Sequence, residues 1–190
     1  RKMKRMILAS GSPRRKELLQ MLEVPFEVLV SDTKEVITKN EPAEVTKELS
    51  YQKAMAVAEQ VEEGIIIGAD TVVSIDGKIL GKPADTEEAR EMIYKLQGKS
   101  HMVYTGVTVI AKSGDMVSAS SFAEGTKVNV APMTENEIEA YISTDEPYDK
   151  AGAYGIQGLF GKFIEGIKGD YFNVVGLPVH RLYEELKKFD

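Results

Sequence analysis

The sequence predicts an α/β protein built on a mixed β-sheet with flanking helices. Apolar runs typical of buried strands, such as 64–75, alternate with segments whose apolar residues have helical spacing. Two long β-branched segments, 100–111 and 116–130, are separated only by a Ser-Gly-Asp turn, which predicts an antiparallel pair. Antiparallel neighbours beside strand–helix alternation indicate a mixed sheet rather than a purely parallel one.

The composition is that of an ordinary globular chain. Its 190 residues suffice for a single domain over 1–190, with two lobes and no evident linker. The net charge of −6 argues against a nucleic-acid partner, which needs a basic face. With no cysteine and only His101 and His180, a zinc site or a Ser-His-Asp triad is poorly supported. Because no membrane-spanning run and no leader peptide is evident, we expect a cytoplasmic protein.

The chain opens with a pattern that favours phosphate binding. A strand over 6–9 enters a loop of small residues, and a helix follows with Ser12 as N-cap and Pro13 at its first position. Backbone N–H groups at a helix N-terminus bind phosphate well. The cations at 14–16 lie at the positive end of the helix dipole, which is unfavourable unless an anion lies between them. We therefore prefer substrate binding to solvated surface charge, and the expected contacts are Ser10, Ser12, Arg14 and Arg15.

The next segments are a strand over 26–30, an acidic loop over 31–35 and a long helix over 41–62 that Pro42 opens. Lys53 lies near the middle of this helix and, taken alone, is interpreted as surface charge. The apolar stripe that predicts the buried face of the helix consists of Leu49, Ala54, Val57, Ala58 and Val61.

The strand over 64–75 contains the candidate reactive carboxylate. Its isoleucines and valines predict burial on both faces, yet Asp70 and Thr71 interrupt the apolar run. An ionised carboxylate in a dry interior is costly unless it is paired or binds a metal. The alternative is an aspartate in a turn or cap. Because Val72 and Val73 continue the strand pattern, we expect Asp70 to face a cleft.

A hairpin is predicted to place a lysine beside this strand. Asp76 and Gly77 form the expected tight turn, and 78–83 forms the returning strand. In that register Lys82 falls opposite Thr71 and faces Asp70 as a cation, the alternative being an ordinary surface lysine.

The rest of the chain contains three more expected helices and two connecting segments. The helices are predicted to start at Asp85 or Thr86, at a capping box of Thr134 and Glu137, and at Pro178. The segment 166–171 is expected to be a loop. The segment 145–158 has too much glycine for a regular element and too many functional side chains for a mere linker.

These residues together are typical of a polyphosphate site. A triphosphate chain needs several cations to hold it, and carboxylates can bind the accompanying metal. Oxygen ligands without a cysteine or histidine cluster favour Mg²⁺ or Mn²⁺. The candidates are Arg14, Arg15, Lys53 and Lys82 as cations and Asp32, Glu35 and Asp70 as acids.

Five motifs then stand in order along nearly the whole chain. They are Leu-Ala-Ser-Gly-Ser-Pro-Arg-Arg at 8–15, Gly-Ala-Asp-Thr-Val-Val at 68–73, Gly-Lys-Pro at 81–83, Tyr-Asp-Lys-Ala-Gly-Ala-Tyr-Gly-Ile-Gln-Gly at 148–158, and Gly-Asp-Tyr at 169–171 through Val-Val-Gly-Leu-Pro at 174–178. In combination they resemble the Maf family of nucleoside triphosphate pyrophosphatases. None of them would suffice alone, but together they are highly specific.

The resemblance implies a two-lobed fold around a cleft, with a strongly twisted mixed sheet, similar to inosine triphosphate pyrophosphatases. It also implies hydrolysis between the α and β phosphates of a nucleoside triphosphate, which yields the monophosphate and pyrophosphate. The family's site residues fall on Asp70 as general base, on Arg14, Thr71 and Gln157 as specificity positions, on Lys53 and Lys82 as phosphate contacts, and on Glu35 beside Asp70 as metal ligands. Lys34 departs from the more acidic loop that is usual in the family.

The segment 155–158 resembles the family branch that acts on dTTP and UTP. An amide both donates and accepts, so Gln157 can pair with O4 and N3–H of uracil or thymine. A buried amide discriminates well because a wrong base leaves polar groups unpaired. The alternative is a plain loop residue. The family resemblance also implies a house-cleaning role, which can extend to modified pyrimidine nucleotides, or a role in arresting cell division, and a homodimer is an expectation from the family alone.

Two other classes of protein remain open. A strand, a small loop and an Arg-rich turn also suit a nucleotidyltransferase, which requires an acceptor sugar. A nucleotide-binding regulator without turnover is the third reading. Pyrophosphate release in the absence of an acceptor separates all three.

Overall fold

The computed structural model describes residues 5–190, which form a seven-stranded mixed sheet with six α-helices around it. The strand order is β2-β1-β3-β5-β6-β7, and β4 pairs with β3. The strands are β1 (Met6–Leu8), β2 (Glu27–Val28), β3 (Glu63–Ile75), β4 (Lys78–Leu80), β5 (Ser100–Ser113), β6 (Met116–Val130) and β7 (Ile164–Lys168). The α-helices are α1 (Pro13–Leu19), α2 (Pro42–Ala58), α3 (Thr86–Leu96), α4 (Glu135–Ile142), α5 (Tyr171–Val175) and α6 (Val179–Leu186).

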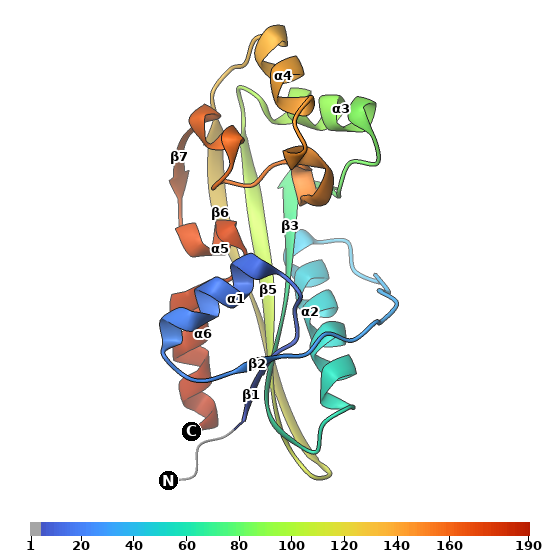
Figure 1. Ribbon diagram of the computed structural model, residues 1–190, viewed down its shortest axis with the longest axis vertical. Helices are drawn as coiled ribbons and strands as arrows, with labels where there is room; N and C mark the ends of the chain where they lie inside the picture. Colours follow the sequence, from blue (N-terminus) through green and yellow to red (C-terminus); the bar gives the residue numbers. More distant parts are fainter. Residues whose placement is uncertain (1–4) are drawn as a thin grey trace.

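The molecule is elongated because β3, β5 and β6 run through most of its length (Figure 1). Helices α3 and α4 lie at one end of these strands, whereas α1, α2 and α6 surround the other end. Within residues 5–190, no helix has both the length and the apolar character that a bilayer crossing requires. The fold class predicted from the sequence, a mixed α/β sheet with flanking helices, is confirmed.

The strand register leaves one stretch of β3 with a neighbour on one side only. β1 pairs in parallel with residues 65–67, and β4 pairs antiparallel with residues 73–75. Of the described strands, only β5 pairs with residues 68–72, which we call the open edge of β3. The loop after β1 reaches this edge, because Ala9 N–H donates to the Ile67 carbonyl oxygen at 2.8 Å. The N-terminal loop and the predicted carboxylate therefore meet at the open edge.

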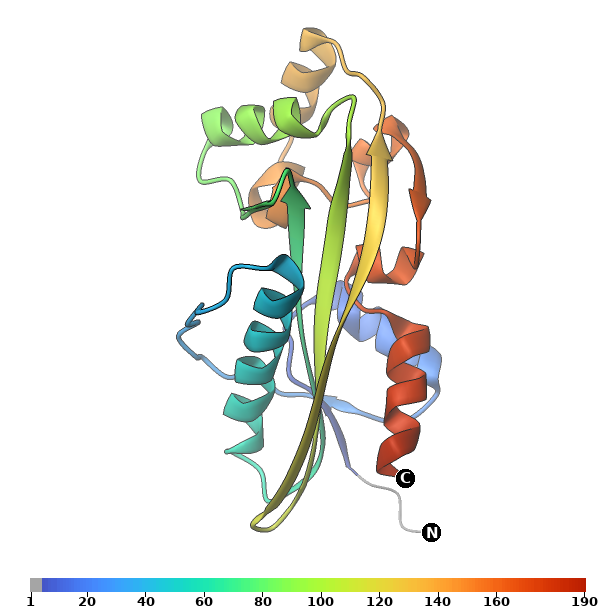
Figure 2. The ribbon, with the colours of Figure 1, turned by 180° about the vertical axis from the view of Figure 1, so that it is seen from behind.

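Helix α2 lies along one face of the sheet (Figure 2). It packs very close to the strands because two glycines lie beneath it. A Cβ atom on Gly68 would lie 2.5 Å from the Ser50 carbonyl oxygen, and one on Gly106 would lie 2.3 Å from the Thr46 carbonyl oxygen. Neither separation is sterically allowed, so any side chain at these two positions would push α2 away from the strands. Gly106 pairs directly opposite Asp70, which places this close approach at the open edge.

Side-chain alternation along β3 separates the two faces of the sheet. Ile66 packs with α2, whereas Ala69 belongs to a cluster with α1 and α6, and Val73 belongs to a cluster with α3 and α4. We call these last two the α1–α6 cluster and the α3–α4 cluster. Thr71 lies between Ala69 and Val73 on the same face, so it marks the seam between the two clusters. Asp70, one residue earlier, points to the α2 face.

Most start signals predicted from the sequence are confirmed. Ser12 caps α1, Asp85 caps α3, and Thr134 forms the capping box of α4 with Glu137. The turn at 76–77 gives the predicted hairpin register, in which Val73 pairs with Leu80 and Ile75 pairs with Lys78. Local cap and turn chemistry was therefore readable without the tertiary structure.

Several predicted boundaries differ from those in the structure. Helix α2 ends at Ala58 rather than at residue 62, and β2 covers two residues rather than five. The predicted loop over 166–171 is wrong, because β7 ends within it and α5 begins there. β7 is five residues long and includes Gly166, so its pairing with the end of β6 decides its conformation more than its own propensity.

A buried histidine packs against the α3–α4 cluster. His101 is 3% exposed, its Nε2 is hydrogen-bonded with the Tyr154 hydroxyl group, and its Nδ1 has no partner in the described part of the chain. Burial lowers the pKa of His101 from 6.5 to about 4, because the cationic ring would lose its hydration.

This histidine predicts a loss of stability in mild acid. Between about pH 6.5 and pH 4 the unfolded chain binds a proton that the folded chain excludes, so the free energy of unfolding falls as the pH falls. The contribution is at most about 3 kcal/mol. The free energy of unfolding, measured with urea, should be lower at about pH 4.5 than at about pH 7, and we expect His101→Phe to remove the contribution of His101 to that difference. The exposed control His180→Gln should leave the difference unchanged, and an equal pH dependence in His101→Phe would contradict the assignment.

Candidate active site

Asp70 and Lys53 form a charged pair at the open edge. Lys53 Nζ lies 2.8 Å from Asp70 Oδ1, and the two side chains are 12% exposed for the aspartate and 25% for the lysine. Asp70 Oδ2 is buried and has no hydrogen-bond partner among residues 5–190. A desolvated carboxylate with one bonded and one free oxygen is positioned to accept a proton or a ligand.

The position of Lys53 corrects the interpretation that its place in the sequence alone suggests. The side chain comes from the middle of α2 and reaches across to β3, where Nζ also lies 3.5 Å from the Ala69 carbonyl oxygen. It reaches that far because Gly68 and Gly106 let α2 approach the sheet. Lys53 is therefore part of the site rather than solvated surface charge.

Lys82 does not occupy the place that the hairpin register predicts. The register itself is correct, but β4 ends at Leu80, and Lys82 is exposed without a hydrogen bond or ion pair to any described residue. The chain leaves the sheet here because the Gly81 carbonyl oxygen accepts from Gly152 N–H at 3.0 Å, and Pro83 has no N–H for a ladder. The cation that faces Asp70 is Lys53, not Lys82.

Glu35 is a second carboxylate near the same lysine, with Oε1 3.7 Å from Lys53 Nζ. Asp32 and Glu35 are both exposed, and the described residues contain no group of three or more His, Cys, Asp or Glu that could hold a metal. A Mg²⁺ ion commonly takes one or two carboxylates and completes its coordination with water and substrate phosphate. The Asp70 carboxylate and Glu35 fit that partial donor set and do not amount to an all-protein cage.

The side chain of Arg15 connects three segments that are distant in the sequence through hydrogen bonds. Its Nε donates to the Gly176 carbonyl oxygen at 2.8 Å, Nη1 to Ser10 Oγ at 3.2 Å, and Nη2 to Thr71 Oγ1 at 2.9 Å. Burial lowers the pKa of Arg15, while the nearby Asp70 carboxylate acts in the opposite direction. The guanidinium group thus fixes the loop before α1 and the residue after α5 against the open edge.

Thr71 belongs to a buried hydrogen-bond network that the sequence did not reveal. Its hydroxyl group lies 2.8 Å from that of Thr105, which pairs opposite it on β5 and donates to the Asn173 carbonyl oxygen at 3.1 Å. The Asn173 amide donates to Thr126 Oγ1 at 3.0 Å and to the Val103 carbonyl oxygen at 3.1 Å. A threonine at position 105 of a β-branched strand is an ordinary strand residue, so only the register with Thr71 could have indicated its role.

The loop and helix cap predicted before α1 are present in the structure. Ser12 Oγ accepts from Arg15 N–H at 3.3 Å, and Ser10 Oγ accepts from Ser12 N–H at 3.3 Å. Arg14 is half-buried, and its charge contributes to the lowered pKa of Asp149, after the larger contribution of the Lys150 hydrogen bond. The start of α1 therefore lies close enough to the segment around Asp149 for their charges to interact.

Gln157 lies in a turn beside the seam between the two clusters. Gly158 N–H donates to the Gly155 carbonyl oxygen at 3.0 Å, and Ile156 packs against both the α1–α6 and the α3–α4 clusters. Because Thr71 marks the same seam, the turn places Gln157 on the Thr71 side of the sheet. Its side chain is exposed and makes no hydrogen bond within the described chain.

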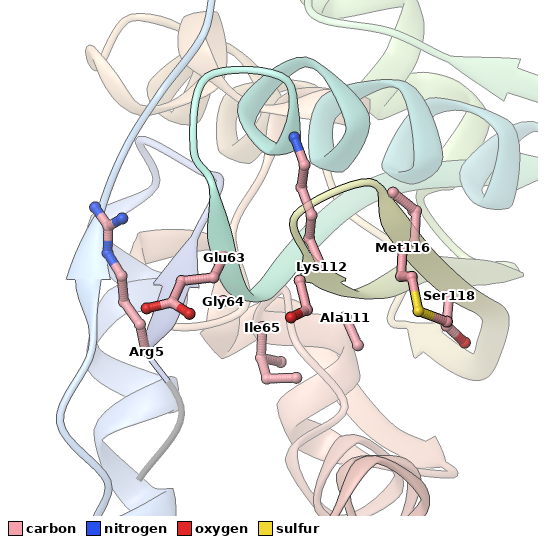
Figure 3. Close-up of a pocket in the computed structure, with 10 residues that line it drawn as sticks. Arg5, Glu63, Gly64, Ile65, Ala111, Lys112, Met116 and Ser118 are labelled. Atoms are coloured by element: carbon pink, nitrogen blue, oxygen red, sulfur yellow. The ribbon is translucent and has the colours of Figure 1, made fainter. Parts of the chain in front are cut away.

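A separate apolar pocket of about 430 Å³ lies at the end of the sheet where β3 begins (Figure 3). It is formed where β3 begins and where the β5–β6 hairpin turns, with Arg5, Glu63, Lys112 and Met116 in its wall. None of the site residues predicted from the sequence lines it. The polar groups at the open edge are therefore the candidate active site, and this pocket is not part of it.

Fold and site together define an α/β protein in which a capped helix N-terminus, a buried Asp–Lys pair and a polar seam converge on one open strand edge. Among solved structures, the Staphylococcus aureus Ham1 protein shares this fold. It aligns with a TM-score of 0.55 and 13% identity over 98% of this chain and 100% of its own.

The chain belongs to the Maf-like protein family, which matches residues 5–189. A relative from Bacillus cytotoxicus, named dTTP/UTP pyrophosphatase, is 54% identical over 99% of this chain and 97% of its own length. A relative of the same name from Bacillus cereus is 50% identical with the same coverage. The family resemblance inferred from the five motifs is thereby confirmed.

Proposed function

We propose that this protein is a nucleoside triphosphate pyrophosphatase that hydrolyses dTTP and UTP to the monophosphate and pyrophosphate. The observation that carries the proposal is the 54% identity, over 99% of the chain, to a relative with that name. Two features of the site support it. Asp70 keeps a free, buried oxygen beside a lysine, and the amide of Gln157 has no partner in the described chain.

In the proposed reaction Asp70 acts as general base. Its Oδ2 takes a proton from a water molecule while the water oxygen forms a bond to the α-phosphorus. The bond between the α-phosphorus and the bridging oxygen breaks, and pyrophosphate leaves with the electron pair. Lys53 holds Oδ1 at 2.8 Å, which orients Oδ2, and its charge also stabilises negative charge on the phosphates.

The remaining predicted residues are proposed to contact the phosphates or the base of the substrate. Ser10, Ser12 and Arg14 lie at the N-terminus of α1, where phosphate oxygens are favoured. Thr71 and Gln157 lie along the seam, where a base would be read. Lys82 has no hydrogen bond or ion pair with residues 5–190 and would turn toward a phosphate, and Arg15 would serve mainly by holding Thr71 and Ser10.

A divalent cation, Mg²⁺ or Mn²⁺, is part of the proposal and when bound would neutralise charge on the triphosphate. Asp70 and Glu35 would hold it together with substrate oxygens. A cytoplasmic location, a homodimer and the absence of a nucleic-acid partner belong to the same proposal.

One assay tests the function against its competitors. Pyrophosphate release is measured from a panel of nucleoside triphosphates with Mg²⁺ or Mn²⁺ and without an acceptor, and dTTP and UTP should be the best substrates. A requirement for an acceptor sugar would favour a nucleotidyltransferase. Tight nucleotide binding without release would favour a regulator.

The base-reading role is tested by Gln157→Glu. A carboxylate cannot donate to O4 of the pyrimidine, so kcat/KM for dTTP and UTP should fall about a hundredfold with little change in Tm. The exposed control Gln20→Glu should leave the substrate profile unchanged. An unaltered profile in Gln157→Glu would remove Gln157 from the recognition scheme.

A further inference from the structure

The turn over residues 155–158, which contains Gln157, is anchored by hydrogen bonds to one carboxylate from another segment, that of Glu146. Both oxygens of Glu146 accept from the backbone N–H of Leu159, at 3.0 Å and 2.9 Å. A charged acceptor on a backbone N–H makes a stronger bond than a neutral one. Glu146 comes from a 3₁₀ helix, η2 (Glu146–Asp149), that precedes the turn in the chain by about a dozen residues.

The same carboxylate fills the space next to Gly158. A Cβ atom on Gly158 would lie 2.5 Å from Glu146 Oε2, so the turn and the carboxylate are in direct contact. Glu146 is half-buried at this point. The contact therefore fixes the C-terminal side of the turn, immediately after Gln157.

The other side of the turn packs against the side chain of Lys150. Its Nζ donates to the Glu146 carbonyl oxygen at 3.1 Å and lies 2.8 Å from Asp149 Oδ1. Its methylene groups cover Gly155, where a Cβ atom would lie 3.1 Å from Lys150 Cδ and Cε. Glu146 and Lys150 thus contact the turn at its two ends, while the Gln157 side chain between them makes no hydrogen bond with any described residue.

We propose that Glu146 is a positioning residue for base recognition, acting through the Leu159 N–H to hold the turn in which Gln157 reads the pyrimidine. This inference rests on the proposed function in so far as that assigns the base to Gln157. It places specificity on a residue that touches neither the base nor the phosphates. Because Asp70 and Lys53 belong to β3 and α2 and have no contact with Glu146 in the structure, loss of the carboxylate should affect which base is accepted more than the chemical step.

The test compares Glu146→Ala with Glu146→Gln and with Glu165→Ala, an exposed glutamate of β7 that serves as a matched control. For each variant, kcat and KM are measured for dTTP, UTP and ATP, and Tm confirms folding. In Glu146→Ala the ratio of kcat/KM for UTP to that for ATP should fall about tenfold, mainly through a higher KM for UTP. Glu146→Gln keeps a carbonyl acceptor and should recover most of the ratio, and Glu165→Ala should match the wild type.

An equal loss for all three triphosphates, or an unchanged ratio in folded Glu146→Ala, would overturn the proposal, because either would mean a merely structural or negligible role. The Kd values of UTP and ATP, measured by calorimetry, give a second readout that does not need turnover. If the wild type released no pyrophosphate from any triphosphate, the proposed function would fail while the Kd ratio still decided the role of Glu146. A wild type without pyrimidine preference in both rate and Kd would overturn the inference as well.

Discussion

Asp70→Asn is expected to slow pyrophosphate release from dTTP and UTP by about a hundred- to ten-thousandfold, the range that a general base contributes. An amide has the same shape as the carboxylate, and its oxygen can still accept from Lys53, but it cannot take the proton from water. The fold should therefore persist while turnover is lost. Single-turnover and steady-state rates, with Tm as a folding check, measure the effect.

Asp76→Asn provides a matched control for this variant. Asp76 lies in the hairpin turn at a φ of 51°, a conformation that asparagine tolerates, and it is exposed. It should keep the wild-type rate. Near-normal pyrophosphate release from folded Asp70→Asn would eliminate Asp70 as the base.

Lys53→Met is expected to have the second-largest effect. The methionine keeps the apolar stem of the side chain but leaves a largely buried carboxylate without its counter-charge. We expect a loss of about 1–3 kcal/mol in the free energy of unfolding, less than for a fully dry pair because Lys53 is 25% exposed. The rate should fall about a hundredfold, because the cation no longer orients Asp70 or stabilises phosphate charge.

A double substitution separates the loss of stability, which comes from the unpaired charge on Asp70, from the loss of rate, which comes from the missing cation. Because the stability loss comes from the unpaired charge on Asp70, adding Asp70→Asn to Lys53→Met should restore most of the stability without restoring turnover. Lys47→Met on the same helix removes only a pair exposed to solvent, with Glu44, and should change stability by no more than about 0.5 kcal/mol. Additive losses in the double variant would show that Lys53 and Asp70 act independently.

The local parts of the fold could be predicted from the sequence because local chemistry determines them. Ser12 as N-cap and Pro13 at the first helical position favour a helix start through local contacts alone, and Asp76 with Gly77 favours a tight turn that sets the hairpin register. The motif around Asp70 indicated its burial correctly, because the apolar residues on both sides of the acid continue the same buried strand.

The parts of the site that depend on distances between elements could not be predicted in this way. A helical lysine is normally solvated, and nothing near Lys53 in the sequence shows that α2 lies close enough for it to reach Asp70. Arg14 and Arg15 are adjacent and chemically alike, yet only Arg15 bonds to Thr71. The extent of β4 was set by the backbone bond between Gly81 and Gly152, a contact across about seventy residues that no local pattern records.

Gly68 and Gly106 have a consequence for how substitutions in this family member should be interpreted. Neither glycine offers a side chain to a substrate, but alanine at either position would displace α2 and draw the ammonium group of Lys53 away from Asp70. In a mutational scan scored by activity, both would resemble catalytic residues. Because these two positions carry no side-chain atoms, the backbone of α2 occupies the space that a Cβ atom would need, and this close packing sets the distance across which Lys53 and Asp70 pair.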